Sequence, residues 1–130
     1  MSDPVPATPA SSPLHTRQVL FVRCLGRLIQ YATERGYELT LGEGFVQSPR
    51  RSRDGRFVED GVHMPDSMHY QRLACDLNLF VRGEYITDSH NMAWLDLGDF
   101  WRSLDPLCRW GGDFKKRDGN HVSISYQGRA

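Results

Sequence analysis

Hydrophobic residues recur along the chain with two different periods, and each period predicts a kind of element. From Leu14 to about Gly36 they recur at helical spacing, which predicts an amphipathic helix that Gly36 ends as a cap. The same spacing over Met92–Leu104, shortly before Pro106, predicts a second helix. The apolar positions of the first helix expected to face the core are Leu14, Phe21, Leu25, Leu28, Ile29 and Ala32.

An alternating pattern predicts strands elsewhere. Three segments show it, namely Tyr37–Leu41, Leu73–Phe80 and His121–Tyr126. Val81–Ile86 is expected to return as a hairpin with Gly83 in the turn. The predicted fold is therefore α+β, with a small antiparallel sheet, a long N-terminal helix behind it and a second helix between two of its strands.

Two segments lack either period. The long connection Gln47–Asp66 is of a kind that is usually functional or mobile in a compact domain. Residues 1–13 hold four of the seven prolines and lack the basic start and apolar centre of a signal peptide. We therefore expect a flexible leader over 1–13 and a single domain over 14–130.

Composition narrows the function classes. Sixteen Lys and Arg balance sixteen Asp and Glu, which removes the overall attraction that non-specific nucleic-acid binding needs. No apolar run is long enough to span a bilayer, so membrane insertion is not expected. Cys24, Cys75 and Cys108 are widely spaced and form no Cys-x-x-Cys pair, which argues against a disulfide framework and a thiolate zinc site.

His69, Asp76 and His121 are the residues that attract chemical interest. Two imidazoles and a carboxylate can bind zinc and leave its fourth tetrahedral position for water, as in catalytic sites. Spacing alone is weak support, because Asp-x-x-His occurs three times and a histidine is often satisfied by a nearby carboxylate. The three pairs are Asp60 with His63, Asp66 with His69, and Asp118 with His121.

The residues around these positions are more specific. The chain reads Ser-x-His-x6-Asp over Ser67–Asp76, followed by Leu-Asn-Leu-Phe, then Cys-Arg-Trp-Gly-Gly over Cys108–Gly112 and Asp-Gly-Asn-His over Asp118–His121. This combination resembles the small zinc peptidases used as phage endolysins. They belong to the family of D-alanyl-D-alanine carboxypeptidases and L-alanyl-D-glutamate endopeptidases, related to the vancomycin-resistance dipeptidases. The resemblance runs from about Leu14 to Arg129 and implies a hedgehog/DD-peptidase-like fold.

The resemblance also implies roles for single residues. His69, Asp76 and His121 would bind Zn²⁺, and Asp118 would be the catalytic base. Ser67 is either a hydroxyl that contacts the substrate or a turn residue that orders the backbone before His69.

The chain departs from the family pattern after its first predicted strand. Many members carry an arginine there that helps to hold the substrate, whereas this chain reads Phe-Val-Gln-Ser-Pro over Phe45–Pro49. Arg50 is the nearest candidate to replace it, and a solvated basic loop explains it equally well. The other candidates are Arg51, Arg53 and Arg56.

The three tryptophans could lie either in the core or along the substrate cleft. Trp94 and Trp101 are seven residues apart in the second predicted helix, which favours the core. Trp110 is expected either in the core or along the cleft.

The resemblance implies a zinc-dependent peptidoglycan hydrolase that serves in phage lysis and cleaves the stem peptide between L-alanine and D-glutamate. Two alternatives stay open, a D-alanyl-D-alanine carboxypeptidase and a non-catalytic, zinc-stabilised wall-binding module. We expect a monomer in the host bacterial cytoplasm, without a signal peptide. It would reach the wall after a separate holin-type protein permeabilises the membrane.

Overall fold

The computed structural model describes residues 8–9, 12–42, 50–51, 57–58 and 71–130. Its helices are α1 (Leu14–Glu34), α2 (Met92–Leu104) and the short 3-10 helix η1 (Gly111–Asp113). Its strands are β1 (Glu38–Leu41), β2 (Arg50–Arg51), β3 (Phe57–Val58), β4 (Ala74–Val81), β5 (Glu84–Ile86), β6 (Cys108–Trp110) and β7 (His121–Ile124). The α+β class is confirmed.

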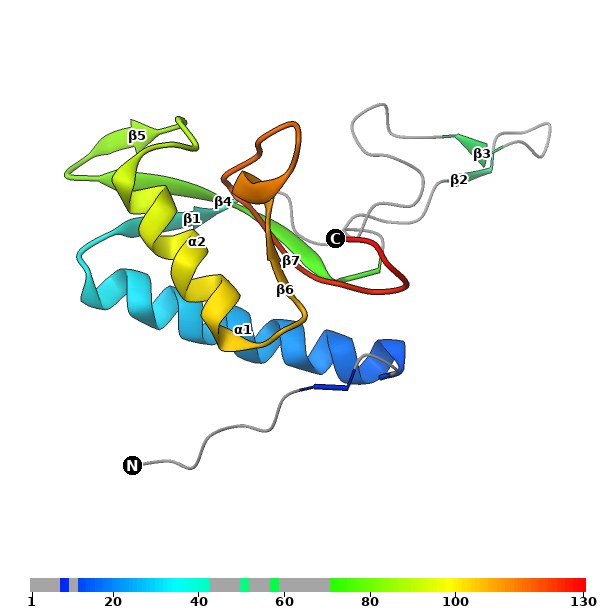
Figure 1. Ribbon diagram of the computed structural model, residues 1–130. Coiled ribbons are helices and arrows are strands. Elements are labelled where there is room, and N and C mark those ends of the chain that lie inside the picture. The colour runs from blue at the N-terminus through cyan, green and yellow to red at the C-terminus, as the bar shows by residue number, and fades with distance from the viewer. Residues whose placement is uncertain (1–7, 10–11, 43–49, 52–56, 59–70) are drawn as a thin grey trace, which may run out of the picture.

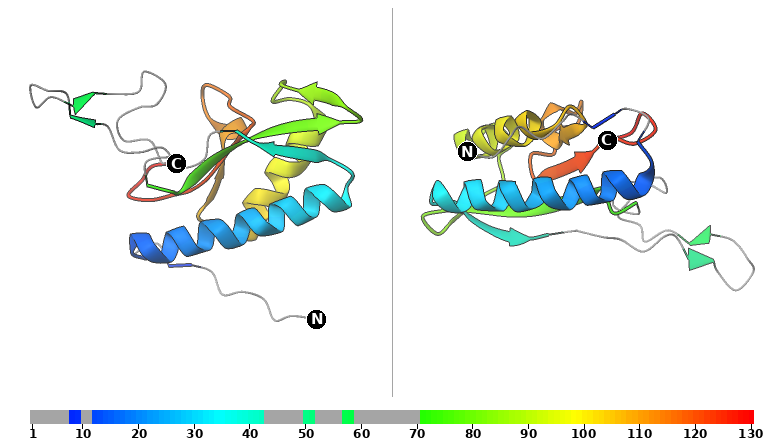
Figure 2. Two further views of the ribbon diagram at one scale, coloured as in Figure 1. Left: turned by 180° about the vertical axis from the view of Figure 1, so that it is seen from behind. Right: turned by 90° about the horizontal axis from the view of Figure 1, so that it is seen from below.

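β4 is the central strand of a five-stranded antiparallel sheet (Figure 1). Four strands follow the order β1-β4-β7-β6, and the fifth, β5, pairs with β4 outside this order. β1 pairs with one edge of β4, while β7 and β5 share the other edge, β7 along its first half and β5 along its second. α1 contacts β1 and β7, and α2 contacts β6 (Figures 1 and 2). β2 pairs with β3 inside Gln47–Asp66, where no element was predicted.

α1 ends as the sequence predicts. Gly36 has φ +78°, and the amides of Gly36 and Tyr37 donate to the carbonyls of Thr33 and Ala32. These are the two hydrogen bonds of a Schellman cap, which favours glycine because an L side chain is strained at this φ.

One face of α1 differs from the prediction. Ile29 is 41% exposed, whereas Arg17 and Cys24 are buried. The Arg17 guanidinium donates to the carbonyls of Ser12 and Ser125. A buried charge is tolerated when its donors are satisfied, so this arginine can occupy a core-facing position that hydropathy alone assigns to solvent.

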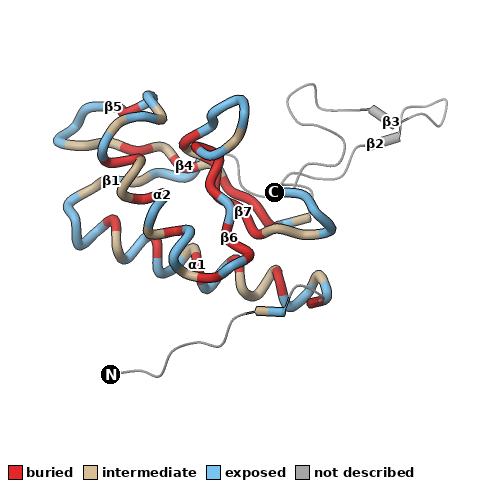
Figure 3. The backbone as a smooth tube through the Cα atoms, viewed as in Figure 1, coloured by how far each residue is buried: buried red, intermediate tan, exposed pale blue. Residues whose placement is uncertain are grey.

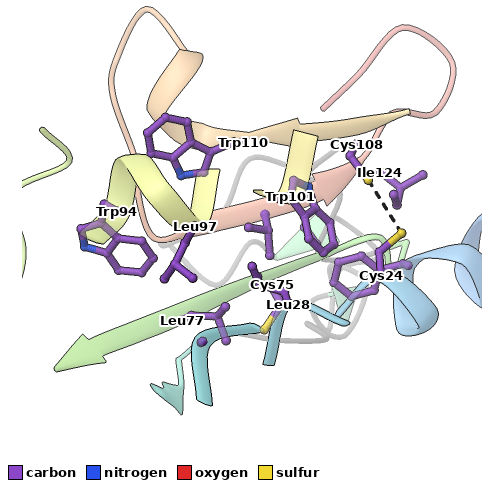
Figure 4. Close-up of a cluster of buried hydrophobic side chains, with 14 of the residues drawn as sticks. Cys24, Leu28, Cys75, Leu77, Trp94, Leu97, Trp101, Cys108, Trp110 and Ile124 are labelled. Atoms are coloured by element: carbon purple, nitrogen blue, oxygen red, sulfur yellow. Dashed lines mark hydrogen bonds between the residues drawn. The ribbon is translucent and has the colours of Figure 1, made fainter. Parts of the chain in front are cut away.

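The core lies between the helices and the sheet, where buried residues occupy β6, β7, much of β4 and the inner sides of the helices (Figure 3). Trp94 and Trp101 are 3% and 0% exposed, as predicted. Trp110 is 2% exposed and belongs to the same cluster, which settles its two alternatives in favour of the core (Figure 4).

All three cysteines are buried free thiols, as expected from their spacing. Cys24 of α1 and Cys108 of β6 face each other with their sulfurs 3.8 Å apart (Figure 4). In a separate contact, the backbone amide and the side-chain hydroxyl of Thr8 both donate to the Asp105 carboxylate. No helix in the described part of the chain has the length and apolarity needed to cross a membrane.

Candidate metal centre

The register between β4 and β7 places Asp76 directly opposite His121. Side chains of directly opposed residues in antiparallel strands project from the same face, with Cβ atoms about 4.5–5.5 Å apart. The Nδ1 atom of His121 accordingly lies 3.4 Å from Oδ1 of Asp76. The side chains are 9% and 21% exposed, so this pair is largely shielded from water.

A tight turn brings Asp118 to the same place. The amide of His121 donates to the carbonyl of Asp118 at 3.0 Å, which closes a four-residue turn immediately before β7. The amide of Asp118 in turn donates to the carbonyl of Gly111 at 2.9 Å. As a result, one possible donor atom from each of Asp76, Asp118 and His121 lies within 4.8 Å of the others.

Two glycines allow this turn to pack so closely. A Cβ on Gly111 would lie 2.0 Å from the carbonyl oxygen of Asp118 and 2.8 Å from Cβ of His121. A Cβ on Gly119 would lie within 3.0 Å of Ser89, whose hydroxyl accepts the Gly119 amide at 2.8 Å. The Trp110 indole N–H donates to the carbonyl of Gly119 at 2.7 Å. The turn is therefore held from β6, from η1 and from the segment before α2.

Neighbouring side chains complete the surroundings. The Phe114 ring lies 5.3 Å from the His121 imidazole, measured between centroids, and is tilted against it. Cys75 points to the opposite face of β4, where it is buried as predicted. Burial, assisted by the charge of Asp76, raises the pKa of the Cys75 thiol to about 11. The thiol is therefore neutral at pH 7 and lies outside the cluster.

The structure thus brings together three of the predicted site residues, Asp76, Asp118 and His121. His69 and Ser67 lie outside the described residues. Arg50 is described only as part of the β2 backbone. Ser89 also supports the site without any sequence signal, because nothing in a local pattern connects it with Gly119, thirty residues away.

The geometry of this cluster fits zinc. Zinc bonds to nitrogen and oxygen are about 2.0–2.2 Å long, so two ligand atoms on one tetrahedral ion lie roughly 3.3–3.6 Å apart. The 3.4 Å between the Asp76 oxygen and the His121 nitrogen falls within that range. Imidazole nitrogen and carboxylate oxygen are also donor types that zinc accepts.

Comparisons with known proteins point to the same family as the sequence motifs. Residues 61–124 match a family model described as D-alanyl-D-alanine carboxypeptidase. This span includes the three residues expected to bind the metal and the one expected to be the catalytic base. The solved structure of Serratia marcescens L-Ala D-Glu endopeptidase ChiX aligns with a TM-score of 0.56 and 20% identity. The alignment covers 85% of this chain and 88% of that one. No curated protein sequence gives a significant match.

The protein therefore has an α+β fold like that of the endopeptidase ChiX, with a possible metal-binding group. The family match and the structural likeness confirm the resemblance to the D-alanyl-D-alanine carboxypeptidase family and support a peptidase.

Proposed function

We propose that the protein is a zinc-dependent peptidoglycan hydrolase that cleaves the stem peptide between L-alanine and D-glutamate. The observation that carries this proposal is the convergence of Asp76, Asp118 and His121 within 4.8 Å on a peptidase fold. The choice of bond is supported by the structural neighbour, which is named for that cleavage.

In this proposal His69, Asp76 and His121 hold the zinc ion. When bound, zinc acidifies a water molecule and polarises the scissile carbonyl. The Asp118 carboxylate accepts a proton from the attacking water and passes it to the leaving amine. Asp118 suits this role because it is exposed, whereas His121 beside it is buried. Ser67 and Arg50 would contact the substrate.

A D-alanyl-D-alanine carboxypeptidase is the second candidate, and the description of the matching family model favours it. Both reactions use the same metal ligands and the same base. They differ in the substrate on either side of the scissile bond. Mass spectrometry of purified muropeptides after digestion separates the two candidates. A new N-terminal D-glutamate identifies the endopeptidase, and loss of one alanine identifies the carboxypeptidase.

A non-catalytic wall-binding module is the alternative from another class. A structural zinc site normally closes all four positions with protein ligands, whereas the proposed set has three ligands and a separate base. Turbidity of a cell-wall suspension tests this directly. Zinc-loaded protein that binds wall material but neither clears it nor releases peptides would overturn the hydrolase proposal.

We place this activity in phage lysis, with a monomeric domain over 14–130 and a leader over 1–13. Expression in a bacterial host should leave cells intact until a holin-type protein permeabilises the membrane. Lysis is followed as culture turbidity with and without the co-expressed holin. Lysis by the protein alone would contradict this placement and leave the chemistry unaffected.

A further inference from the structure

A small pocket of about 240 Å³ adjoins the metal cluster and shares Asp118 with it. Its floor is formed by buried apolar residues, Leu77, Ile86 and Trp94. Its walls come from β5, from the segment between β5 and α2, and from the turn that precedes β7. The hydrogen bond from the Gly119 amide to Ser89 joins two of these walls, so the pocket is built on the contact that also holds Asp118.

The lining of this pocket contains two charged residues. Arg117 is the cation and Asp118 the anion among the described residues that line it. Arg117 is exposed, and the structure shows no ion pair between it and another described residue. Its guanidinium is therefore available to a ligand, next in sequence to the proposed base. Lys115 and Lys116 precede it in the same loop but do not line the pocket.

The two candidate substrates share one feature close to the scissile bond. In the bond between L-alanine and D-glutamate, the D-glutamate supplies the nitrogen and keeps a free α-carboxylate, because the stem peptide continues through its γ-carboxyl group. In a terminal D-alanyl-D-alanine, the last residue supplies the nitrogen and also carries a free α-carboxylate. In both cases a single carbon atom separates the anion from the nitrogen that Asp118 would protonate.

We propose that Arg117 determines specificity by binding the α-carboxylate of the residue on the leaving side of the scissile bond. The inference rests on the proposed function and assigns a substrate-binding role to a residue outside the motifs that carry the family resemblance. A guanidinium pairs with a carboxylate through two parallel hydrogen bonds, which fixes orientation as well as charge. Binding there would hold the leaving nitrogen within reach of the Asp118 carboxylate.

Binding to zinc-loaded protein carrying Asp118→Asn tests the inference without turnover. Calorimetry compares a peptide containing L-alanyl-D-glutamate with the same peptide carrying an α-carboxamide. We expect the carboxylate to bind about tenfold to a hundredfold more tightly, the range of a hydrogen bond to a charged group. Adding Arg117→Gln should abolish this preference, Arg117→Lys should retain part of it, and the matched change Lys116→Gln should leave it intact.

Turnover by the otherwise native protein provides the second measurement. Arg117→Gln should lower kcat/KM for the carboxylate peptide and leave that for the carboxamide peptide nearly unchanged. A peptide ending in D-alanyl-D-alanine and its C-terminal amide form the second pair, which shows which source of the carboxylate is used. Thermal unfolding followed by circular dichroism confirms that each variant is folded.

The proposed function and the role of Arg117 can be overturned separately. If the native protein cleaves wall peptides but treats carboxylate and carboxamide alike, the role of Arg117 is wrong and the proposed function stands. A carboxylate preference that survives Arg117→Gln has the same meaning. If the zinc-loaded native protein neither binds nor cleaves any of the four peptides, the proposed function and this inference both fall.

Discussion

Asp118 and His121 belong to one four-residue turn but differ in exposure, and in the proposed mechanism this difference would separate proton transfer from metal binding. Asp118→Asn preserves size and much of the hydrogen bonding but cannot accept a proton. The protein should stay folded and retain zinc while kcat falls by roughly 10²–10⁴, the usual contribution of general acid–base catalysis. Turnover assays combined with zinc analysis of the same sample measure both properties.

Two other acidic residues serve as controls for Asp118, because each also stands three positions before a histidine. Asp60→Asn and Asp66→Asn should leave turnover within a few-fold of the native value. Both residues lie outside the described part of the chain. If Asp66→Asn is the inactive variant, the base has been assigned to the wrong Asp-x-x-His pair.

His121 is buried opposite Asp76, so we expect its removal to weaken metal binding above all. His121→Ala deletes one of three proposed ligands, and we expect zinc content after dialysis to fall well below one ion per chain. Elemental analysis of the dialysed protein measures this. Stoichiometric zinc in the variant would show that His121 is not the third ligand.

Gly111 offers a test of the close approach that shapes the turn. Gly111→Ala must push the Asp118 carbonyl away from a Cβ that would lie 2.0 Å from it. We expect a loss of about 1–3 kcal/mol in the free energy of unfolding, together with reduced turnover. Gly26→Ala is the matched control, since its Cβ meets nothing within 4 Å in the middle of α1. That control should instead gain up to about 1 kcal/mol, measured by urea unfolding.

Local sequence signals located both α-helices well. α2 begins and ends at the predicted residues, Met92 and Leu104. Asn91 provides a cap before it and Pro106 follows its end, so both boundaries are marked in the chain itself. β6 was not predicted, because three residues are too few to show an alternating pattern.

The candidate site depends on contacts that no local pattern records. Asp76 meets His121 through the register of β4 against β7, and periodicity within each strand cannot specify that pairing. Family resemblance linked the two residues where spacing could not. The helical pattern was wrong at two positions of α1, where Ile29 is exposed and Arg17 is buried. For Arg17 the reason is tertiary, because its guanidinium donates to the carbonyl of Ser125.

The cap of α2 predicts how one substitution changes the free energy of unfolding. The Asn91 side-chain oxygen accepts the amide of Ala93 at 2.9 Å. Asn91→Ala should therefore lower the free energy of unfolding by about 1 kcal/mol. Met92→Ala alters the next residue, which is 79% exposed, and should change it by less than about 0.5 kcal/mol. Equal effects of the two substitutions in urea unfolding would contradict a capping role.

Metal binding and the folding of the chain should be coupled. Asp76 and His121 come from distant parts of the chain and meet only in the folded sheet, so the unfolded chain lacks the site. Chelation should abolish activity, and zinc should restore it. Free zinc at 100 times its dissociation constant should add about 2.7 kcal/mol of stability and raise Tm. Calorimetry measures this shift, and His121→Ala should not show it.

The segment 111–119, which leads into the turn before β7, is anchored at both ends, and this anchoring has an evolutionary consequence. Gly111, Gly119 and Trp110 fix the ends of this segment, whereas Lys115, Lys116 and Arg117 between them are exposed. Mutations in the exposed stretch can accumulate without moving the cluster, because the bonds that hold it lie outside that stretch. If Arg117 binds the substrate as proposed, substrate preference can diverge among descendants of this protein while the arrangement of Asp76, Asp118 and His121 is retained.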